Sequence, residues 1–163
     1  MILVKIINAI HTYQTKIWYS LIFKRRIVFG KRIHFRRAFN LTNTGKVIIG
    51  DNCFFNNYCS INCRKYIKIG TNTIFGENVK IYDHNHKFSD KSKKIKDQGY
   101  SEASVIIGDD CWIGSNVTIL KGVVIGNRCV IGAGVTLKHS ISDQSIVSMN
   151  ENNININKIK FDN

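Results

Sequence analysis

The chain has 163 residues, of which 44% are hydrophobic, and a formal net charge of +13 at pH 7. This length predicts a single domain, and no apolar run is long enough for a helix that spans a bilayer. No proline occurs, which suits a fold in which nearly every backbone N–H joins a hydrogen-bonded ladder.

The positive charge is concentrated in the N-terminal third. No acidic residue precedes Asp51, whereas lysines and arginines are frequent in that stretch. Such an excess favours an anionic partner, for example a membrane surface, a phosphate-bearing lipid carrier or an acidic saccharide, although a solvated face would carry it equally well. No nucleic-acid-binding motif or array of stacking aromatics accompanies the charge, so we expect no nucleic-acid partner.

Residues 1–26 are predicted to form an amphipathic helical segment. Large apolar residues recur there with helical spacing on one broad face. They are Leu3, Ile6, Ile7, Ile10, Tyr13, Ile17, Trp18, Leu21 and Ile22. Lys5 interrupts the one candidate core of a signal peptide, so we expect a cytoplasmic protein. The basic, amphipathic segment is compatible with peripheral association at the inner face of a membrane.

Residues 27–149 are predicted to form an all-β solenoid. Large apolar residues recur every six positions, often followed by Gly, and this period is typical of a parallel β-helix built from hexapeptides. These anchors are Phe29, Phe35, Leu41, Ile49, Phe55, Ile61, Ile69, Phe75, Ile81, Ile107, Ile113, Ile119, Ile125, Ile131 and Leu137. Three hexapeptides make one coil, so we expect about five coils, with a long loop at residues 87–106 extruded from the third. The tail, residues 150–163, should cap the stack or be loosely ordered.

A small side chain four residues after most anchors is expected to point into the coil. These positions hold Cys53, Cys59, Thr73, Val79, Cys111, Val117, Val123, Cys129 and Val135. Four of the five cysteines are therefore predicted to be interior, and only Cys63 falls outside the pattern. No Cys-x-x-Cys pair exists and the count is odd, so we interpret the cysteines as buried, reduced and structural, and we expect no metal.

The segment at the largest break in the repeat carries the residues best suited to chemistry. Residues 81–86 read IYDHNH and lead directly into the long loop. Imidazole titrates near neutral pH, so it can take a proton from a hydroxyl group and return it within one cycle. Either His84 or His86 is therefore a candidate general base, with Asp83 or Asn85 beside it.

This motif, the loop after it and residues 107–115 (IGDDCWIGS) resemble the hexapeptide-repeat O-acetyltransferases. That family includes galactoside and maltose acetyltransferases and enzymes that acetylate capsular or O-antigen sugars. The resemblance covers roughly residues 47–142. It implies a left-handed parallel β-helix, acetyl-CoA as co-substrate and a homotrimer with active sites between subunits. The implied activity is acetyl transfer to a saccharide hydroxyl, for example on a cell-envelope or capsular polysaccharide or its precursor.

The resemblance also implies roles for particular residues. The family's general base lies five positions after its anchor, which is His86 when counted from Ile81, with His84 as the second candidate. Asn56, on the preceding coil, matches a residue that contacts the acceptor or the acyl group. The positions that match an aromatic residue near the site, the coenzyme A groove and a lysine for the cofactor phosphates are Trp112, Ser115, Ala133 and Lys138.

Three alternatives stay open on the sequence. An amino group on an amino sugar would accept an acetyl group in place of a hydroxyl. A zinc enzyme that resembles the carbonic-anhydrase β-helices would use His84 and His86 as ligands, but such a site needs three protein ligands and an open position. A non-catalytic scaffold would need neither the histidines nor the loop. The lysines of the loop favour an anionic acceptor or the cofactor phosphates.

Overall fold

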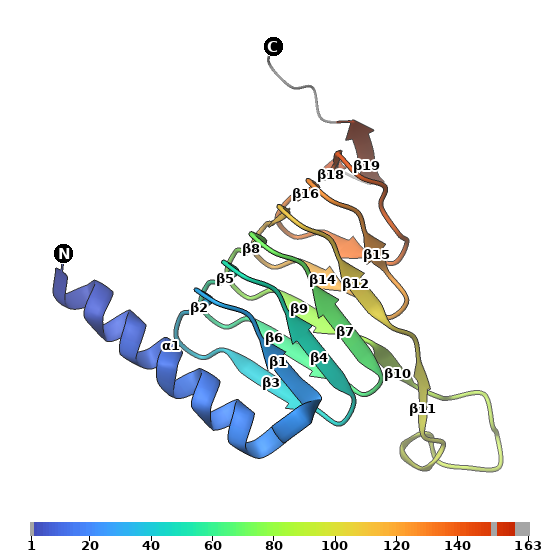
Figure 1. Cartoon of the computed structure of the whole chain (residues 1–163). Coiled ribbons are helices and arrows are strands. Elements are labelled where there is room, and N and C mark those ends of the chain that lie inside the picture. Colours follow the sequence, from blue (N-terminus) through green and yellow to red (C-terminus); the bar gives the residue numbers. More distant parts are fainter. Residues whose placement is uncertain (1, 151–152, 159–163) are drawn as a thin grey trace.

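The chain folds into a β-solenoid in which strands of successive coils stack side by side into three sheets (Figure 1). The computed structural model describes residues 2–150 and 153–158. Each coil gives one strand to each sheet, in the order first, second and third. We call the turn from the first to the second sheet the first corner, the turn from the second to the third sheet the second corner, and the turn into the next coil the third corner.

The three sheets are parallel apart from the last strand pair of the second sheet. The first sheet contains β1 (Ile27–Phe29), β4 (Lys46–Ile49), β7 (Tyr66–Ile69), β12 (Val105–Ile107) and β15 (Val124–Ile125). The second contains β2 (His34–Phe35), β5 (Phe54–Phe55), β8 (Ile74–Phe75), β13 (Trp112–Ile113), β16 (Val130–Ile131), β18 (Ser145–Asn150) and β19 (Asn153–Lys158). The third contains β3 (Asn40–Asn43), β6 (Ser60–Cys63), β9 (Lys80–Tyr82), β14 (Thr118–Ile119) and β17 (Thr136–Leu137).

The strand pairing confirms the predicted parallel β-helix and extends it. Five complete coils run from β1 to β17. Ile141 then bridges to Ile125 and β18 joins the second sheet, which begins a sixth coil. β18 pairs antiparallel with β19, so part of the predicted tail covers the last coil, while residues 151–152 and 159–163 lie outside the described residues.

The apolar anchors form one continuous core along the axis of the solenoid. Almost all of them are buried, as are the small residues predicted to point inward. Phe35, Phe55 and Phe75 stack from coil to coil with ring centroids 5.2 and 4.5 Å apart. Each coil alone would leave its apolar side chains exposed to water, and stacking is what buries them.

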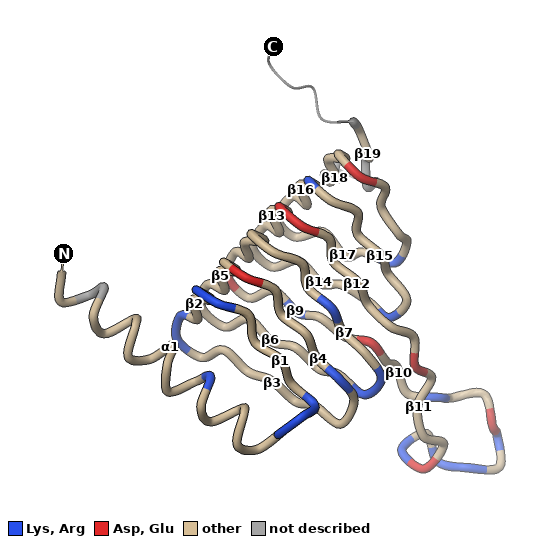
Figure 2. Tube along the Cα trace, viewed as in Figure 1, with Lys and Arg blue, Asp and Glu red and all other residues tan. Residues whose placement is uncertain are grey.

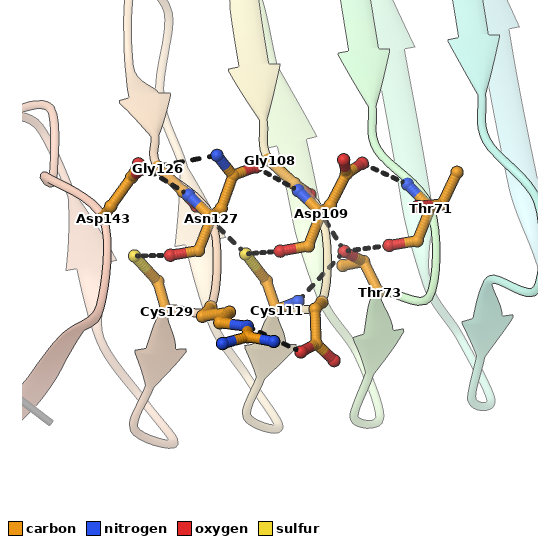
Figure 3. A network of polar contacts seen from close by, with 11 residues as sticks. Thr71, Thr73, Gly108, Asp109, Cys111, Gly126, Asn127, Cys129 and Asp143 are labelled. Carbon is orange, nitrogen blue, oxygen red and sulfur yellow. Dashed lines mark hydrogen bonds and ion pairs between the residues drawn. The ribbon is translucent and has the colours of Figure 1, made fainter. Parts of the chain in front are cut away.

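The cysteine-rich first corner is held together by hydrogen bonds between coils (Figure 3). A stack of thiol and hydroxyl donors reaches the backbone carbonyl of the following coil at each level. The pairs are Cys53 to Gly70 at 3.0 Å, Thr73 to Gly108 at 3.0 Å, Cys111 to Gly126 at 3.1 Å and Cys129 to Ser142 at 3.2 Å. Small donors therefore suit this corner, because they fill the interior and satisfy a carbonyl at the same time.

The glycines that follow the anchors allow adjacent coils to approach closely at this corner. A Cβ added to Gly108 would lie 2.6 Å from the carbonyl carbon of Gly126, which is closer than any real side chain comes to backbone. On the outside of the same corner the carboxylate of Asp109 accepts the N–H of Thr71 at 2.7 Å (Figure 3). The repeat of Gly and a short polar residue is thus explained by contacts between coils.

Cys63 is the one cysteine that does not lie at the small interior position of the six-residue repeat. Cys63 is buried, and it stacks between Asn43 and Asp83 at the third corner. The first coils carry two extra residues there, because stacked anchors are 20 residues apart from Phe29 to Ile49 and 18 apart from Ile107 to Ile125. The insertion lengthens β3 and β6 and turns one more side chain inward. A strict six-residue count does not predict this additional interior position.

All five cysteines are expected to resist thiol reagents in the native protein. Burial raises the pKa of Cys53, Cys59 and Cys111 to about 11 and that of Cys63 to about 12, so the reactive thiolate is scarce at neutral pH. Titration with a chromogenic disulfide should give almost no reaction in buffer and five reactive thiols in denaturant. Fast labelling of one or more cysteines in buffer would contradict this burial.

The N-terminal helix α1 (Ile2–Phe23) packs on the first coil through a face other than the apolar one, and the short 3-10 helix η1 (Lys24–Arg26) connects it to β1. Several polar residues turn toward the coil and contact its backbone carbonyls, namely His11, Thr12, Lys16 and Tyr19. The nine apolar residues predicted as one face point instead to solvent, each being 42% or more exposed. Among the described residues no helix is long and apolar enough to cross a membrane.

The orientation of α1 follows from the backbone groups that the first coil leaves unpaired. The Thr12 hydroxyl donates to the carbonyl of Phe35 and accepts its N–H, at 3.3 and 3.1 Å. The Tyr19 hydroxyl donates to the carbonyl of Phe39 and accepts the N–H of Leu41, at 3.2 and 3.1 Å. An exposed strand edge needs such partners, and only the polar face of the helix can supply them.

Candidate active site

The long loop leaves the solenoid through a two-stranded stem at the third corner of the third coil. β10 (His84–His86) pairs antiparallel with β11 (Tyr100–Glu102), so that His84 lies opposite Glu102 and His86 opposite Tyr100. Beyond this stem the loop includes the short 3-10 helix η2 (Ile95–Asp97). The loop therefore emerges from regular β-structure, and β12 resumes the coil at Val105.

Asp83, at the base of the stem, is fully buried and bonded on both carboxylate oxygens. It accepts the backbone N–H groups of Arg64, Lys65 and Tyr66 at 2.8, 2.7 and 2.9 Å. The thiol of Cys63 lies 3.3 Å from the same carboxylate. Burial alone would raise the pKa of Asp83, but these hydrogen bonds and the one from His84 outweigh it and leave the pKa below its ordinary value. Asp83 is thus a buried anion at neutral pH.

The two histidines lie on one side of β10, because residues two apart on a strand share a face. His84 Nδ1 is 3.0 Å from Asp83 Oδ1. Since an ionised carboxylate can only accept, His84 Nδ1 carries the proton of this hydrogen bond. His86 is exposed at the outer end of β10, and its ring lies 4.5 Å from that of Tyr100. Tyr100 also contacts His84 edge-on, with centroids 5.3 Å apart.

Residues from the coils below and above hold the stem in place. The guanidinium carbon of Arg64, on the second coil, lies 3.7 Å from the ring centroid of Tyr100. Arg64 Nε also forms an ion pair with Glu102 Oε1 at 3.1 Å. Lys121, on the fourth coil, donates to the hydroxyl of Ser101 at 3.0 Å. The stem is therefore fixed on both sides, as the support of a catalytic group should be.

Sequence reasoning did not identify Arg64, Tyr100, Glu102 or Lys121. They come from different coils or from the far end of the loop, and no six-residue pattern connects them. The one local signal was the aromatic residue at position 100, just before the repeat resumes. Its significance depends on the antiparallel pairing of β10 with β11.

The other predicted site residues lie at a different edge of the solenoid. Asn56, Ser115 and Ala133 follow β5, β13 and β16, and so occupy the second corner. Trp112 lies nearby on the outer face of the second sheet and is 55% exposed. Lys138 follows β17 at the third corner, the corner from which the histidine stem emerges two coils earlier. One chain therefore does not bring all seven predicted residues together.

Two of these second-corner side chains already make hydrogen bonds within the solenoid. The Ser115 hydroxyl accepts the N–H of Glu77 at 3.1 Å, and the Asn56 side-chain oxygen accepts the N–H of Asn57 at 2.9 Å. Both are half-buried, whereas Ala133 and Lys138 are exposed. Among the described residues of one chain, no group of three His, Cys, Asp or Glu is arranged to hold a metal ion.

This hexapeptide solenoid with a histidine pair on a loop stem is similar to the bacterial hexapeptide transferases. The model of the bacterial transferase hexapeptide, with six repeats, matches residues 104–139. A solved hexapeptide-repeat acetyltransferase of Vibrio cholerae, complexed with acetyl coenzyme A, has the same fold, with a TM-score of 0.73 and 23% identity over 88% of this chain and 76% of that one.

Two curated relatives are named as acetyltransferases. A probable acetyltransferase of Mycobacterium tuberculosis is 36% identical over 101 residues, which is 62% of this chain and 32% of that protein. WbbJ of Escherichia coli, a putative lipopolysaccharide biosynthesis O-acetyl transferase, is 37% identical over 111 residues, which is 64% of this chain and 57% of that protein. The chain is therefore similar to hexapeptide-repeat acetyltransferases. It spans about a third and somewhat over half of these two relatives.

Proposed function

We propose that this protein is an acetyl-CoA-dependent O-acetyltransferase that transfers an acetyl group to a sugar hydroxyl. The observation that carries the proposal is the imidazole pair on a braced stem, directly above a buried carboxylate. The relatives support it, because one is named for O-acetyl transfer in lipopolysaccharide biosynthesis and a solved structure of the same fold holds acetyl coenzyme A.

His86 is proposed as the general base. Its ring is exposed on the stem and rests against Tyr100, so it is oriented and still open to an acceptor. It would remove the proton of the sugar hydroxyl while the oxygen attacks the thioester carbonyl, and would then protonate the departing thiolate. Backbone N–H groups would stabilise the oxyanion formed between these steps.

His84 is the second candidate, since its Nδ1–H is bonded to a buried carboxylate in the manner of a base with an orienting partner. In the mechanism with His86 as base, the Asp83–His84 pair instead fixes the stem from below. The two roles differ in one result. Loss of the His84 ring should impair stability more than turnover if His86 is the base, and turnover directly if His84 is.

A homotrimer is proposed because the predicted site residues are divided between two edges. In a threefold arrangement the third corner of one solenoid would face the second corner of its neighbour, which would bring His86 near Trp112, Ser115 and Ala133 of another copy. The exposed loop residues Phe88 (76%) and Ile95 (59%) support this arrangement, because they would gain cover from a neighbouring subunit.

The acceptor is proposed to be an anionic glycan of the cell envelope or capsule, or its precursor. Five lysines of the loop are exposed beyond the histidine stem, and the same charges would also suit the cofactor phosphates. They are Lys87, Lys91, Lys93, Lys94 and Lys96.

The test is acetyl transfer from radiolabelled acetyl-CoA to a panel of neutral, acidic and amino-bearing glycans. We expect label in acidic or neutral glycans and its release by mild alkali or hydroxylamine, because esters are cleaved under conditions that leave amides intact. Alkali-stable label only on amino sugars would favour the N-acetyltransferase alternative. No transfer to any glycan, together with stoichiometric zinc in the purified protein, would favour the carbonic-anhydrase alternative.

A further inference from the structure

The outward face of α1 is a large apolar surface that nothing in the described part of the chain covers. Ile2, Leu3, Ile6, Ile7, Ile10, Tyr13, Ile17, Trp18, Leu21 and Ile22 are all exposed on it. None of the described side chains on this face is charged, and Lys16 turns away from it to donate to the carbonyl of Gly30 at 3.0 Å. An apolar area of this size in a water-exposed position marks an interaction site.

Basic residues border this face at the C-terminal end of α1 and on the first coil beside the helix. Lys24, Arg25 and Arg26 form the exposed turn at the end of α1. The first coil adds further exposed bases, which are Lys31, Arg32, Arg36 and Arg37. Figure 2 shows these charges at the α1 end of the solenoid, whereas acidic residues occur only on later coils and in the loop. The apolar face and its basic border therefore fit a partner that has an apolar interior beneath a negatively charged surface.

We propose that α1 lies in the interface of a bilayer that contains anionic phospholipids, with its outward face among the acyl chains and its basic border at the headgroups. A helix of 22 residues is about 33 Å long, enough to lie flat along a membrane. Tyr13 and Trp18 on this face have the amphipathic rings that favour the headgroup level. The hydroxyl groups of Thr12 and Tyr19 on the opposite face already bond to the first coil.

The basic residues favour an anionic membrane, rather than a second copy of the chain, as the partner of this face. If two copies paired through the same face, the bases of Lys24–Arg26 and of the first coil would be brought toward their own equivalents. No acidic residue within the first 50 positions could offset them. Anionic headgroups neutralise the same charges, and each basic residue near such a surface strengthens binding roughly fivefold.

The test is co-sedimentation of the full chain with vesicles of phosphatidylcholine alone or mixed with phosphatidylglycerol. We expect binding to the mixed vesicles, weakened by salt. The substitutions Lys24→Gln, Arg25→Gln and Arg26→Gln together should weaken it roughly 100-fold. Ile10→Glu and Ile17→Glu should each weaken it roughly 10-fold or more, because an apolar side chain is removed from the acyl region. Val124→Glu, a comparable exposed change on the fifth coil, should bind as the wild type does.

The substituted side chains are exposed, so circular dichroism and the melting temperature should not change, which separates loss of binding from loss of fold. The proposal is overturned if the wild type ignores the mixed vesicles, or if Ile10→Glu binds as well as Val124→Glu. It is also overturned if Ile10→Glu lowers the molar mass of the particle in light scattering without affecting vesicle binding, because the face would then be a contact between subunits. Acetyl transfer to a soluble acceptor is not needed for any of these outcomes.

Discussion

Replacing His86 with Ala should lower kcat by about 10²- to 10⁴-fold, the usual contribution of a positioned general base. The change should leave the melting temperature almost unaltered, because the ring is exposed and rests against the ring of Tyr100. The KM for acetyl-CoA should stay within a few-fold of the wild-type value, since the base acts in the transition state. Thiol release from acetyl-CoA in the presence of the acceptor measures both constants.

Two further histidine variants serve as controls for this prediction. His34→Ala removes an exposed imidazole from β2, far from the stem along the chain, and should leave kcat unchanged. His84→Ala should lower stability through the loss of its bond to Asp83. If His84→Ala removes turnover in a protein that is still folded while His86→Ala keeps it, His84 is the base and our assignment is incorrect.

Replacing Asp83 with Asn should destabilise the fold by about 2–4 kcal/mol. The carboxylate accepts three backbone N–H groups from the turn between the second and third coils and the start of β7. An amide offers one oxygen, and its NH₂ group would face donors. Unfolding in urea at neutral pH measures the difference. Asp97→Asn, an exposed change in η2, should have little effect and is the matched control.

The difference in unfolding free energy between the wild type and Asp83→Asn should also depend on pH. The pKa of Asp83 is lower in the folded chain than its ordinary value. The stabilisation by its ionised form is therefore present above the unfolded value of about 4 and is lost as the pH falls through the lower, folded value. The difference in unfolding free energy between wild type and Asp83→Asn should be constant near neutrality and shrink below about pH 4. A difference that grows on acidification would contradict an ionised Asp83.

The solenoid could be predicted because its cause is local and repeated. An anchor such as Ile113 or Ile131 is apolar because it is buried in the core of its coil. The same requirement returns in every coil, so it is visible in the sequence as a six-residue period. The extent of the third corner was harder to predict. Two added residues turned Cys63 inward, and with it the buried position that Asp83 occupies on the next coil.

The helix α1 shows a second limit of prediction from the sequence. Its pattern correctly indicates an amphipathic helix, but a pattern does not say which face meets the protein. In α1 the unpaired backbone at Phe35 and Leu41 requires hydroxyl partners, so Thr12 and Tyr19 turn inward and the apolar residues outward. The contacts around the histidines could not be predicted from the sequence either, because Arg64 and Tyr100 meet only through the stacking of coils and the pairing of β10 with β11.

A structure of the protein with coenzyme A, together with its state of association in that crystal, tests the central claim most directly. We expect the cofactor in a groove between two solenoids, with its sulfur within hydrogen-bond reach of the His86 ring, and with Ser115 and Ala133 of the neighbouring copy beside the pantetheine arm. A cofactor sulfur far from both histidines, or a cofactor bound to a lone chain away from the loop stem, would contradict the account.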